Sequence, residues 1–232
     1  FKITVDQNNS FLEVELDYLH ENGNIDLKVY DASNLLVADS LTADDTESVF
    51  FKSGAGDYFI KVFGDNEYNE YDLTWNVFED DIYEENDERS NSANIITDAG
   101  TVINGAQFDD DWYRVNVSDA NSTLFVNLSF IHADGNIDLE LYDSSNAVLA
   151  SSASTSDSEV ISLQVPVAGD YFIRVFGANL NTSYSLIWNA VLDDAFEEND
   201  TLLTAANITG SEETPLDGVE LDEDWFRIDL PA

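Results

Sequence analysis

The chain has 232 residues, of which 44% are hydrophobic, 12% aromatic and 24% charged, and its 48 acidic and 8 basic residues give a net charge of −40. This hydrophobic content can build packed cores, which excludes a disordered acidic tail. The charge repels phosphate backbones and anionic membrane faces, so we expect no nucleic-acid partner and no membrane insertion, while the lack of cysteine excludes disulfides.

Short β-strands are predicted along the chain, because runs rich in β-branched and aromatic residues alternate with Gly, Asn, Asp and Ser turn signals. The clearest runs are residues 112–117, 124–130, 136–142, 159–165, 171–176 and 183–191. About eight such strands per unit predict an all-β fold of tandem, jelly-roll-like antiparallel sandwiches. The exceptions are two acidic segments, where Asp87 or Asp200 would cap a short helical turn through residues 92–95 or 203–206.

The sequence repeats with a period of about 113 residues, which sets the domain organisation. Residues 1–79 are expected to be a sandwich repeat that lacks its N-terminal segment, and residues 80–192 a complete repeat. Residues 193–232 are expected to be the N-terminal segment of a further repeat. The two partial pieces are complementary, so they either form a split domain, within one chain or between chains, or one of them is disordered. The chain begins with Phe1, which suggests an interior fragment of a longer protein whose export signal lies outside it.

Acidic residues recur at fixed places in the repeat, unlike the diffuse charge elsewhere. Residues 84–87 are followed by the acidic run 109–111, and residues 197–200 by the run 222–224. Carboxylate and amide oxygens are the ligands that Ca²⁺ prefers. Exposed loop acids are the alternative, but recurrence in both copies favours a calcium site.

Four motifs in order resemble the bacterial pre-peptidase C-terminal domain family, over essentially the whole chain. They are Asp-x-Tyr/Phe-Glu-x-Asn-Asp at 81–87, Asp-x-Asp-Trp-Tyr/Phe-Arg at 109–114, Gly-Asn-Ile-Asp-Leu-x-Leu/Val-Tyr-Asp at 135–143, and Ala-Gly-Asp-Tyr-Phe-Ile-Arg-Val-Phe-Gly at 168–177. The resemblance implies jelly-roll sandwiches of secreted peptidases and surface proteins. The related collagen-binding domains of bacterial collagenases hold Ca²⁺ between an acidic linker and an Asp pair that precedes an aromatic residue.

Carried onto this chain, the resemblance implies a calcium ligand set in each copy. The candidates are Glu84, Asn86, Asp87, Asp109 and Asp111 in the first copy and Glu197, Asn199, Asp200, Asp222 and Asp224 in the second. The related linkers carry a further Glu where this chain has Ile82 and Ala195, and the adjacent Asp81 and Asp194 are candidate replacements.

Other polar and aromatic groups give weaker signals. Residues 22–26 and 134–138 could contact a cation, but a turn that leads into a strand explains them better. The two histidines, His20 and His132, are repeat equivalents, and no Gly-x-Ser-x-Gly or His-Glu-x-x-His motif occurs, so we expect no enzyme. The tryptophans form equivalent pairs typical of core packing, while Tyr68 and Tyr71 are candidates for a sugar-binding platform.

The sequence therefore predicts a non-catalytic, calcium-binding, extracellular or cell-surface repeat that acts as a spacer or adhesion segment of a large bacterial protein. Its expected partners are calcium ions, neighbouring repeats of the same protein, and an extracellular glycan or protein ligand. The alternative is a collagen- or polysaccharide-binding accessory module of an exported peptidase or other hydrolase.

Overall fold

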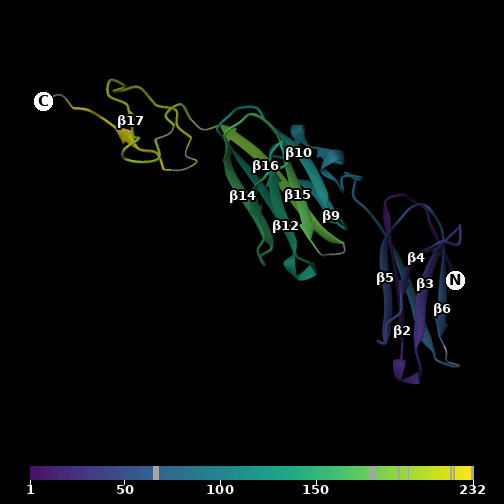
Figure 1. The fold of residues 1–232 in the computed structure, drawn as a ribbon. Helices are drawn as coiled ribbons and strands as arrows, with labels where there is room; N and C mark the ends of the chain where they lie inside the picture. The colour runs from purple at the N-terminus through teal and green to yellow at the C-terminus, as the bar shows by residue number, and fades with distance from the viewer. Residues whose placement is uncertain are drawn as a thin grey trace. The chain divides into compact units, whose positions relative to one another are not determined.

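The structure is a computed structural model that describes residues 1–230 except 65–67, 178–180, 193, 198, 220 and 222. The chain divides into two compact units, Phe1–Glu85 and Asn86–Ala232 (Figure 1). Both are built from β-strands, with only four 3₁₀ turns among the described residues, at His20–Asn22, Arg89–Asn91, Ile96–Asp98 and His132–Asp134. The predicted all-β sandwich class is confirmed. No helix in the described part of the chain has the length and apolar character needed to cross a bilayer.

The first unit is a sandwich of two antiparallel sheets. One sheet has the strand order β1-β6-β3-β4 and the other the order β5-β2-β7. The strands are β1 (Lys2–Val5), β2 (Ser10–Tyr18), β3 (Ile25–Asp31), β4 (Leu36–Ser40), β5 (Thr46–Ser53), β6 (Gly56–Gly64) and β7 (Tyr71–Glu79).

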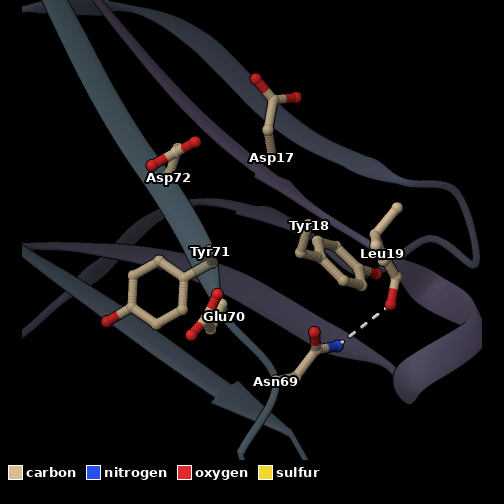
Figure 2. A pocket seen from close by; sticks show the side chains of 7 residues that line it. All are labelled: Asp17, Tyr18, Leu19, Asn69, Glu70, Tyr71 and Asp72. Carbon is tan, nitrogen blue, oxygen red and sulfur yellow. Dashed lines mark hydrogen bonds between the residues drawn. The ribbon is translucent and has the colours of Figure 1, made fainter.

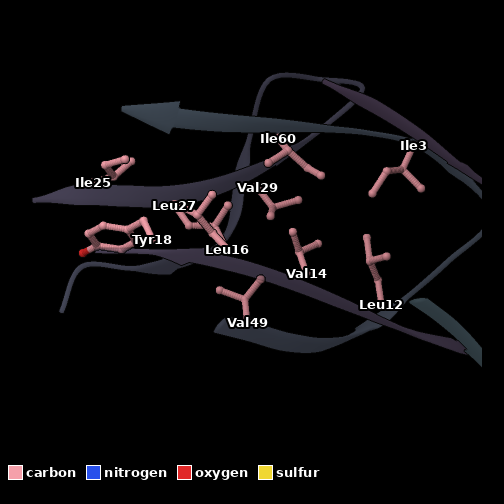
Figure 3. Close-up of a cluster of buried hydrophobic side chains, with 10 residues drawn as sticks. All are labelled: Ile3, Leu12, Val14, Leu16, Tyr18, Ile25, Leu27, Val29, Val49 and Ile60. Atoms are coloured by element: carbon pink, nitrogen blue, oxygen red, sulfur yellow. The ribbon is translucent and has the colours of Figure 1, made fainter. Parts of the chain in front are cut away.

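The core of the first unit follows from alternation along β2. Leu12, Val14 and Leu16 point inward and are fully buried, while the acidic residues between them face outward. They meet β-branched and aliphatic side chains from the opposite sheet (Figure 3). The period of two is therefore what fixes which face of the sheet is buried.

The second unit contains a larger sandwich with the same strand arrangement plus two additional strands. Its sheets have the orders β13-β12-β15-β10-β8 and β14-β11-β16-β9. The strands are β8 (Ala93–Asn94), β9 (Ile103–Gln107), β10 (Asp111–Val117), β11 (Ser122–Phe130), β12 (Ile137–Tyr142), β13 (Val148–Ser152), β14 (Ser158–Val165), β15 (Gly169–Gly177) and β16 (Thr182–Leu192).

A short C-terminal pair follows. Strand β17 (Ala206–Asn207) pairs in parallel with β18 (Phe226–Arg227), as β8 pairs in parallel with β10. The two copies share this parallel geometry because equivalent segments pair in each. In the first copy, the segment after Asp87 pairs with the strand that begins at Asp111; in the second copy, the segment after Asp200 pairs with the strand that follows Asp224.

The helical turn predicted at residues 92–95 is misplaced. Ala93–Asn94 is a strand that pairs with β10, and the turns lie on either side of it, at Arg89–Asn91 and Ile96–Asp98. In the second copy, Ala206 likewise belongs to a strand. The backbone of this segment bonds to a neighbouring strand, and this tertiary pairing overrides the local capping signal.

Two polar loops, one between β4 and β5 and one between β13 and β14, are fixed by buried glutamates. Glu47 accepts hydrogen bonds from the Thr42 backbone N–H (2.9 Å) and hydroxyl (2.7 Å). At the equivalent place, Glu159 accepts from the Ser154 N–H (2.8 Å) and hydroxyl (2.6 Å) and from the Ser152 hydroxyl. Each loop is thus held by one carboxylate that the fold withdraws from solvent.

Candidate metal centre

Three carboxylates converge in the C-terminal segment. Oxygen atoms of Asp194, Glu197 and Asp224 all lie within 4.8 Å of one another, although the chain separates the first two from the third by more than two dozen residues. Carboxylates held this close repel each other, so their convergence is favourable only when a cation or a set of donors compensates the charge.

The amide of Asn199 lies beside two of these carboxylates, Glu197 and Asp224, and is fully buried. One terminal atom of the amide is 3.2 Å from Asp224 Oδ1 and 3.1 Å and 3.2 Å from the two oxygens of Glu197. If that atom is the nitrogen, it donates to the carboxylates; if it is the oxygen, four oxygens converge on one point. The second orientation is a set of hard oxygen donors, which is what Ca²⁺ requires.

Backbone hydrogen bonds hold these side chains in place. The Trp225 N–H donates to the Asn199 carbonyl (2.9 Å), which joins the acidic turn to the strand after Asp224. Asp194 accepts from the N–H groups of Phe196 (2.7 Å) and Val219 (2.9 Å). The site is therefore set by the local backbone and does not depend on flexible side chains alone.

The first copy shows the same backbone arrangement within the second unit. The Trp112 N–H donates to the Asn86 carbonyl (2.9 Å), and the Asn86 amide reaches back to the Trp112 carbonyl (3.4 Å). Side-chain oxygens of Asn86, Asp87, Asp109 and Asp111 are buried. These four predicted ligands thus have oxygen atoms that are shielded from solvent, as the ligands of a bound cation are.

A buried tyrosine pair orients Asp111. The Tyr184 hydroxyl donates to Asp111 Oδ2 (2.9 Å) and lies 2.5 Å from the Tyr113 hydroxyl. The three side chains are buried, so this network fixes one carboxylate oxygen of Asp111. Sequence reasoning missed Tyr184, since its position on β16, some seventy residues downstream, gives no local signal.

The remaining predicted ligands have different outcomes. Glu84 belongs to the first unit, where its Oε2 lies 3.9 Å from Lys52 Nζ. In the second copy, Asp200 has a buried Oδ1 for which the described residues provide no hydrogen-bond donor. Asp222 lies outside the described residues, so its place in the ligand set stays a prediction. Asp194, a candidate replacement for the missing Glu of the linker, does join the cluster.

Asp110 has a structural role that separates it from the acids on either side. It accepts from Arg174 at 2.6 Å and 2.9 Å, and the same guanidinium bonds Glu140 at 3.0 Å and lies over Phe176. Burial lowers the pKa of Arg174, but the hydrogen bonds to Asp110 and Glu140 outweigh it, so this pKa lies above its ordinary value. Asp110 is therefore already neutralised by a cation from the chain.

The second polar constellation forms turns. Asn24 Nδ2 donates to Asp26 Oδ1 (2.6 Å), and Asn136 Nδ2 donates to Asp138 Oδ1 (2.8 Å). Gly23, at φ 118°, provides a backbone conformation that L-residues rarely adopt. The geometry supports the turn interpretation.

Comparison with models of known protein families finds one match. Residues 109–177 match the model of the bacterial pre-peptidase C-terminal domain. No match was found among curated proteins.

Several solved structures resemble parts of the chain. The pre-peptidase C-terminal domain of a collagenase from Bacillus anthracis is 18% identical, with 38% of this chain and 88% of that chain covered and a TM-score of 0.34. The periplasmic g-type lysozyme inhibitor PliG of Aeromonas hydrophila is 16% identical, covers 38% and 82%, and has a TM-score of 0.31. The tandem CBM22 domains of Xyn10C from Paenibacillus barcinonensis are 10% identical, cover 84% and 83%, and have a TM-score of 0.26. At these TM-scores, the likenesses carry no argument about function.

Proposed function

We propose that this chain, whose residues 109–177 match the model of the bacterial pre-peptidase C-terminal domain, is a non-catalytic, calcium-binding repeat segment of an extracellular bacterial protein. It would act as a spacer or adhesion segment. The observation that carries the proposal is the convergence of Asp194, Glu197 and Asp224, with the buried amide of Asn199 beside the last two.

The donor chemistry fits calcium better than the other common metals. Histidine, cysteine and methionine, which soft or borderline metals prefer, do not contribute: the chain has no Cys and no Met, and the cluster contains only oxygen donors. Ca²⁺ accepts six to eight oxygens in irregular arrangements, whereas Mg²⁺ requires near-ideal octahedral geometry. A site built on a turn and a strand terminus therefore suits the larger ion.

Repeat equivalence extends the site to the first copy. Asp194, Glu197 and Asp224 correspond to Asp81, Glu84 and Asp111. We therefore assign calcium in the first copy to Asp81 and Glu84 together with Asn86, Asp87, Asp109 and Asp111, and in the second copy to Asp194, Glu197, Asn199, Asp200, Asp222 and Asp224.

Calcium would act by replacing repulsion among carboxylates with attraction. Only the folded chain assembles the ligands, so each bound ion would stabilise the folded state by about 2.7 kcal/mol when free calcium is 100 times the Kd. In a protein with a net charge of −40, the ions would also reduce self-repulsion.

The test is calorimetric titration of the full chain with Ca²⁺, paired with thermal melting in calcium and in chelator. We expect binding, and a higher melting temperature in calcium than in magnesium at the same ionic strength. Asp224→Asn should remove the second-copy site, while Glu212→Gln, an exposed acid on the same segment, should leave it intact. Melting curves that do not change between calcium and chelator would sink the proposal.

A second candidate is supported by the family match itself, since the family is named for its place beside peptidases. In this case, the chain is an accessory module that binds collagen or polysaccharide for an exported hydrolase. Binding of the full chain to immobilised collagen and to a glycan array distinguishes the two. Saturable binding to collagen or to a glycan supports the accessory role. Binding to neither of them supports the spacer role.

A further inference from the structure

Two of the eight basic side chains of this acidic protein have no carboxylate partner and meet in one hollow. Among the described residues, ion pairs with carboxylates are formed by Lys2, Lys52, Arg174 and Arg227. Lys28 and Lys61 lie over the ring of Phe63. The remaining two, Arg89 and Arg114, form no ion pair with the part of the chain that the structure describes, although the chain has 48 acidic residues.

The hollow that these two arginines share lies on the outer face of a sheet of the second unit. Arg114 alternates with the buried Tyr113 and Val115 on β10, so it faces away from the core, and it lies opposite Phe172 of β15 in the sheet register. The volume of the hollow is about 690 Å³, within the usual range for small-molecule sites. We call it the arginine hollow; its lining residues are Arg89, Ser90, Ser92, Arg114, Asn146 and Phe172.

Arg89 is held in place from two sides. Its Nη2 donates to the carbonyls of Asp143 and Ser144, both at 3.0 Å, and its guanidinium carbon lies 4.0 Å from the centre of the Phe172 ring. These contacts orient the planar group but leave its charge without a carboxylate. An anion that binds here therefore meets a preorganised guanidinium and loses less free energy to side-chain ordering.

Arg114 is partly buried and has no partner for its charge. Its side chain makes no hydrogen bond with the described residues, and its Nε is shielded from solvent without an acceptor, as is the Nε of Arg89. A donor that has lost water and gained no acceptor costs free energy, and more so when the group is charged. An anion in the hollow would compensate both guanidinium charges.

The first unit resolves the same position differently. The counterpart of Arg114 is Lys2, whose Nζ lies 2.8 Å from Asp57 Oδ2. The counterpart of Asp57 is Asp170, which accepts from the Asn116 amide at 2.7 Å and forms no ion pair with Arg114 among the described residues. The equivalent carboxylate is thus present in the second unit, but it is bonded to a neutral group.

The C-terminal copy shows that the basic lining is not general to the repeat. Arg227, a further counterpart of Arg114, has its Nε 3.3 Å from Asp229 Oδ1, and the middle copy has Asn116 in place of this aspartate. The counterparts of Arg89, Ser90 and Ser92 are Leu202, Leu203 and Ala205. The combination of two unpaired arginines with hydroxyl groups therefore belongs to the middle copy and not to the motifs that the copies share.

A hollow of similar size in the first unit has the opposite charge. It has a volume of about 620 Å³ and is lined by Asp17, Tyr18, Leu19 and residues 69–72 (Figure 2). Its three carboxylates, on Asp17, Glu70 and Asp72, repel an anion. The chain therefore contains its own example of a hollow that should reject the ligand of the arginine hollow.

We propose that the arginine hollow binds one uronate, a sugar residue that carries a single carboxylate. The guanidinium groups bind the planar carboxylate through charge-assisted hydrogen bonds. The hydroxyls of Ser90 and Ser92 and the amide of Asn146 both donate and accept, as sugar hydroxyls require. A single charge is favoured because the surrounding protein, with a net charge of −40, repels the further charges of a dense polyanion.

This site is separate from the proposed calcium site, because none of its lining residues is a calcium ligand candidate. Either proposal can therefore fail alone. It also gives the polysaccharide-binding alternative a specific place on the chain and a specific class of sugar.

The test is titration of the full chain with sodium D-glucuronate, followed by heteronuclear NMR of the arginine Nε–H groups. The titration is made in chelator, so that free calcium does not bind the sugar. We expect the signals of Arg89 and Arg114 to shift and saturate with a Kd of about 1 mM, which is typical of a ligand of this size. D-glucose in matched sodium chloride should leave both signals in place, since it lacks the carboxylate.

Arg114→Gln should weaken binding by about tenfold or more, the effect of losing one charge-assisted hydrogen bond. Lys2→Gln is the matched control, because it removes the equivalent basic residue of the first unit and should leave the affinity unchanged. The NMR spectrum of each variant reports directly whether it is folded.

Three results would overturn the proposal. One is the absence of saturable shifts up to about 20 mM glucuronate, well above the expected Kd. Another is unchanged affinity in a folded Arg114→Gln variant, which would place binding elsewhere. The third is binding of sodium acetate or of the peptide Gly-Glu-Gly as tightly as glucuronate, which would show that the hollow recognises any carboxylate or an acidic peptide and not a sugar.

Discussion

Replacing Tyr184 with Phe tests how much the buried hydrogen-bond network around Asp111 contributes to the stability of the folded state. The Tyr184 hydroxyl donates to Asp111 Oδ2 at 2.9 Å and bonds the Tyr113 hydroxyl at 2.5 Å. A hydrogen bond to a charged group contributes about 1.5–3 kcal/mol and a neutral one about 0.5–1.5 kcal/mol. The loss of both should lower the free energy of unfolding by about 2–4 kcal/mol. For a sandwich of this size, this corresponds to a fall in melting temperature of about 8–16 °C, at about 4 °C per kcal/mol.

The chain provides its own control in Tyr71→Phe. Tyr71 is the repeat counterpart of Tyr184 but is exposed on β7, so its hydroxyl should contribute less than about 0.5 kcal/mol. Differential scanning calorimetry of the full chain in chelator separates the network from any contribution of calcium. A Tyr184→Phe transition within about 2 °C of wild type, or an equal loss in Tyr71→Phe, would refute the reasoning.

Two further predictions rest on single contacts. Gly105→Ala places a Cβ 2.3 Å from Tyr184 Cζ, so it should lower the free energy of unfolding by about 1–3 kcal/mol or more, and an unchanged urea midpoint would contradict this. The pKa of Asp143 lies below its ordinary value because its carboxylate accepts from the Ala147 N–H and from Ser145. The folded state therefore gains stability above the unfolded pKa of about 4 and loses it as the pH falls through the lower folded pKa. Asp143→Asn should melt below wild type at neutral pH, with a difference that closes on acidification; a difference that is constant with pH would exclude this role.

The strands of the sandwiches were predictable because alternation with a period of two is a local property. The run 124–130 appears in the structure as β11 (Ser122–Phe130), and 183–191 as β16 (Thr182–Leu192). Residues 92–95 were predicted incorrectly as a helical turn, because the signal at Asp87 is a local capping preference and the structure satisfies this backbone by pairing with β10.

The candidate site was predictable to a different extent. Repetition singled out Asn199 and Asp224, and the structure brings these residues together with Glu197. Asp194 was predicted only as a candidate replacement for the Glu that this linker lacks. Its place in the cluster depends on a turn fixed by the N–H groups of Phe196 and Val219, which the sequence does not reveal. Tyr184 gave no signal at all, since its bond to Asp111 depends on how two distant strands cross the sandwich.

The buried glutamates that hold the two polar loops have a consequence for resistance to proteolysis. A protease must draw a segment of several residues out of its loop before it can cleave the chain, and the cost of this local unfolding sets the rate of cleavage. Glu47 ties the backbone and hydroxyl of Thr42 to a strand, and Glu159 does the same for Ser154. The exposed loops that would otherwise be the first points of attack are therefore anchored from within, which would give the sandwiches durability in a medium where peptidases are active.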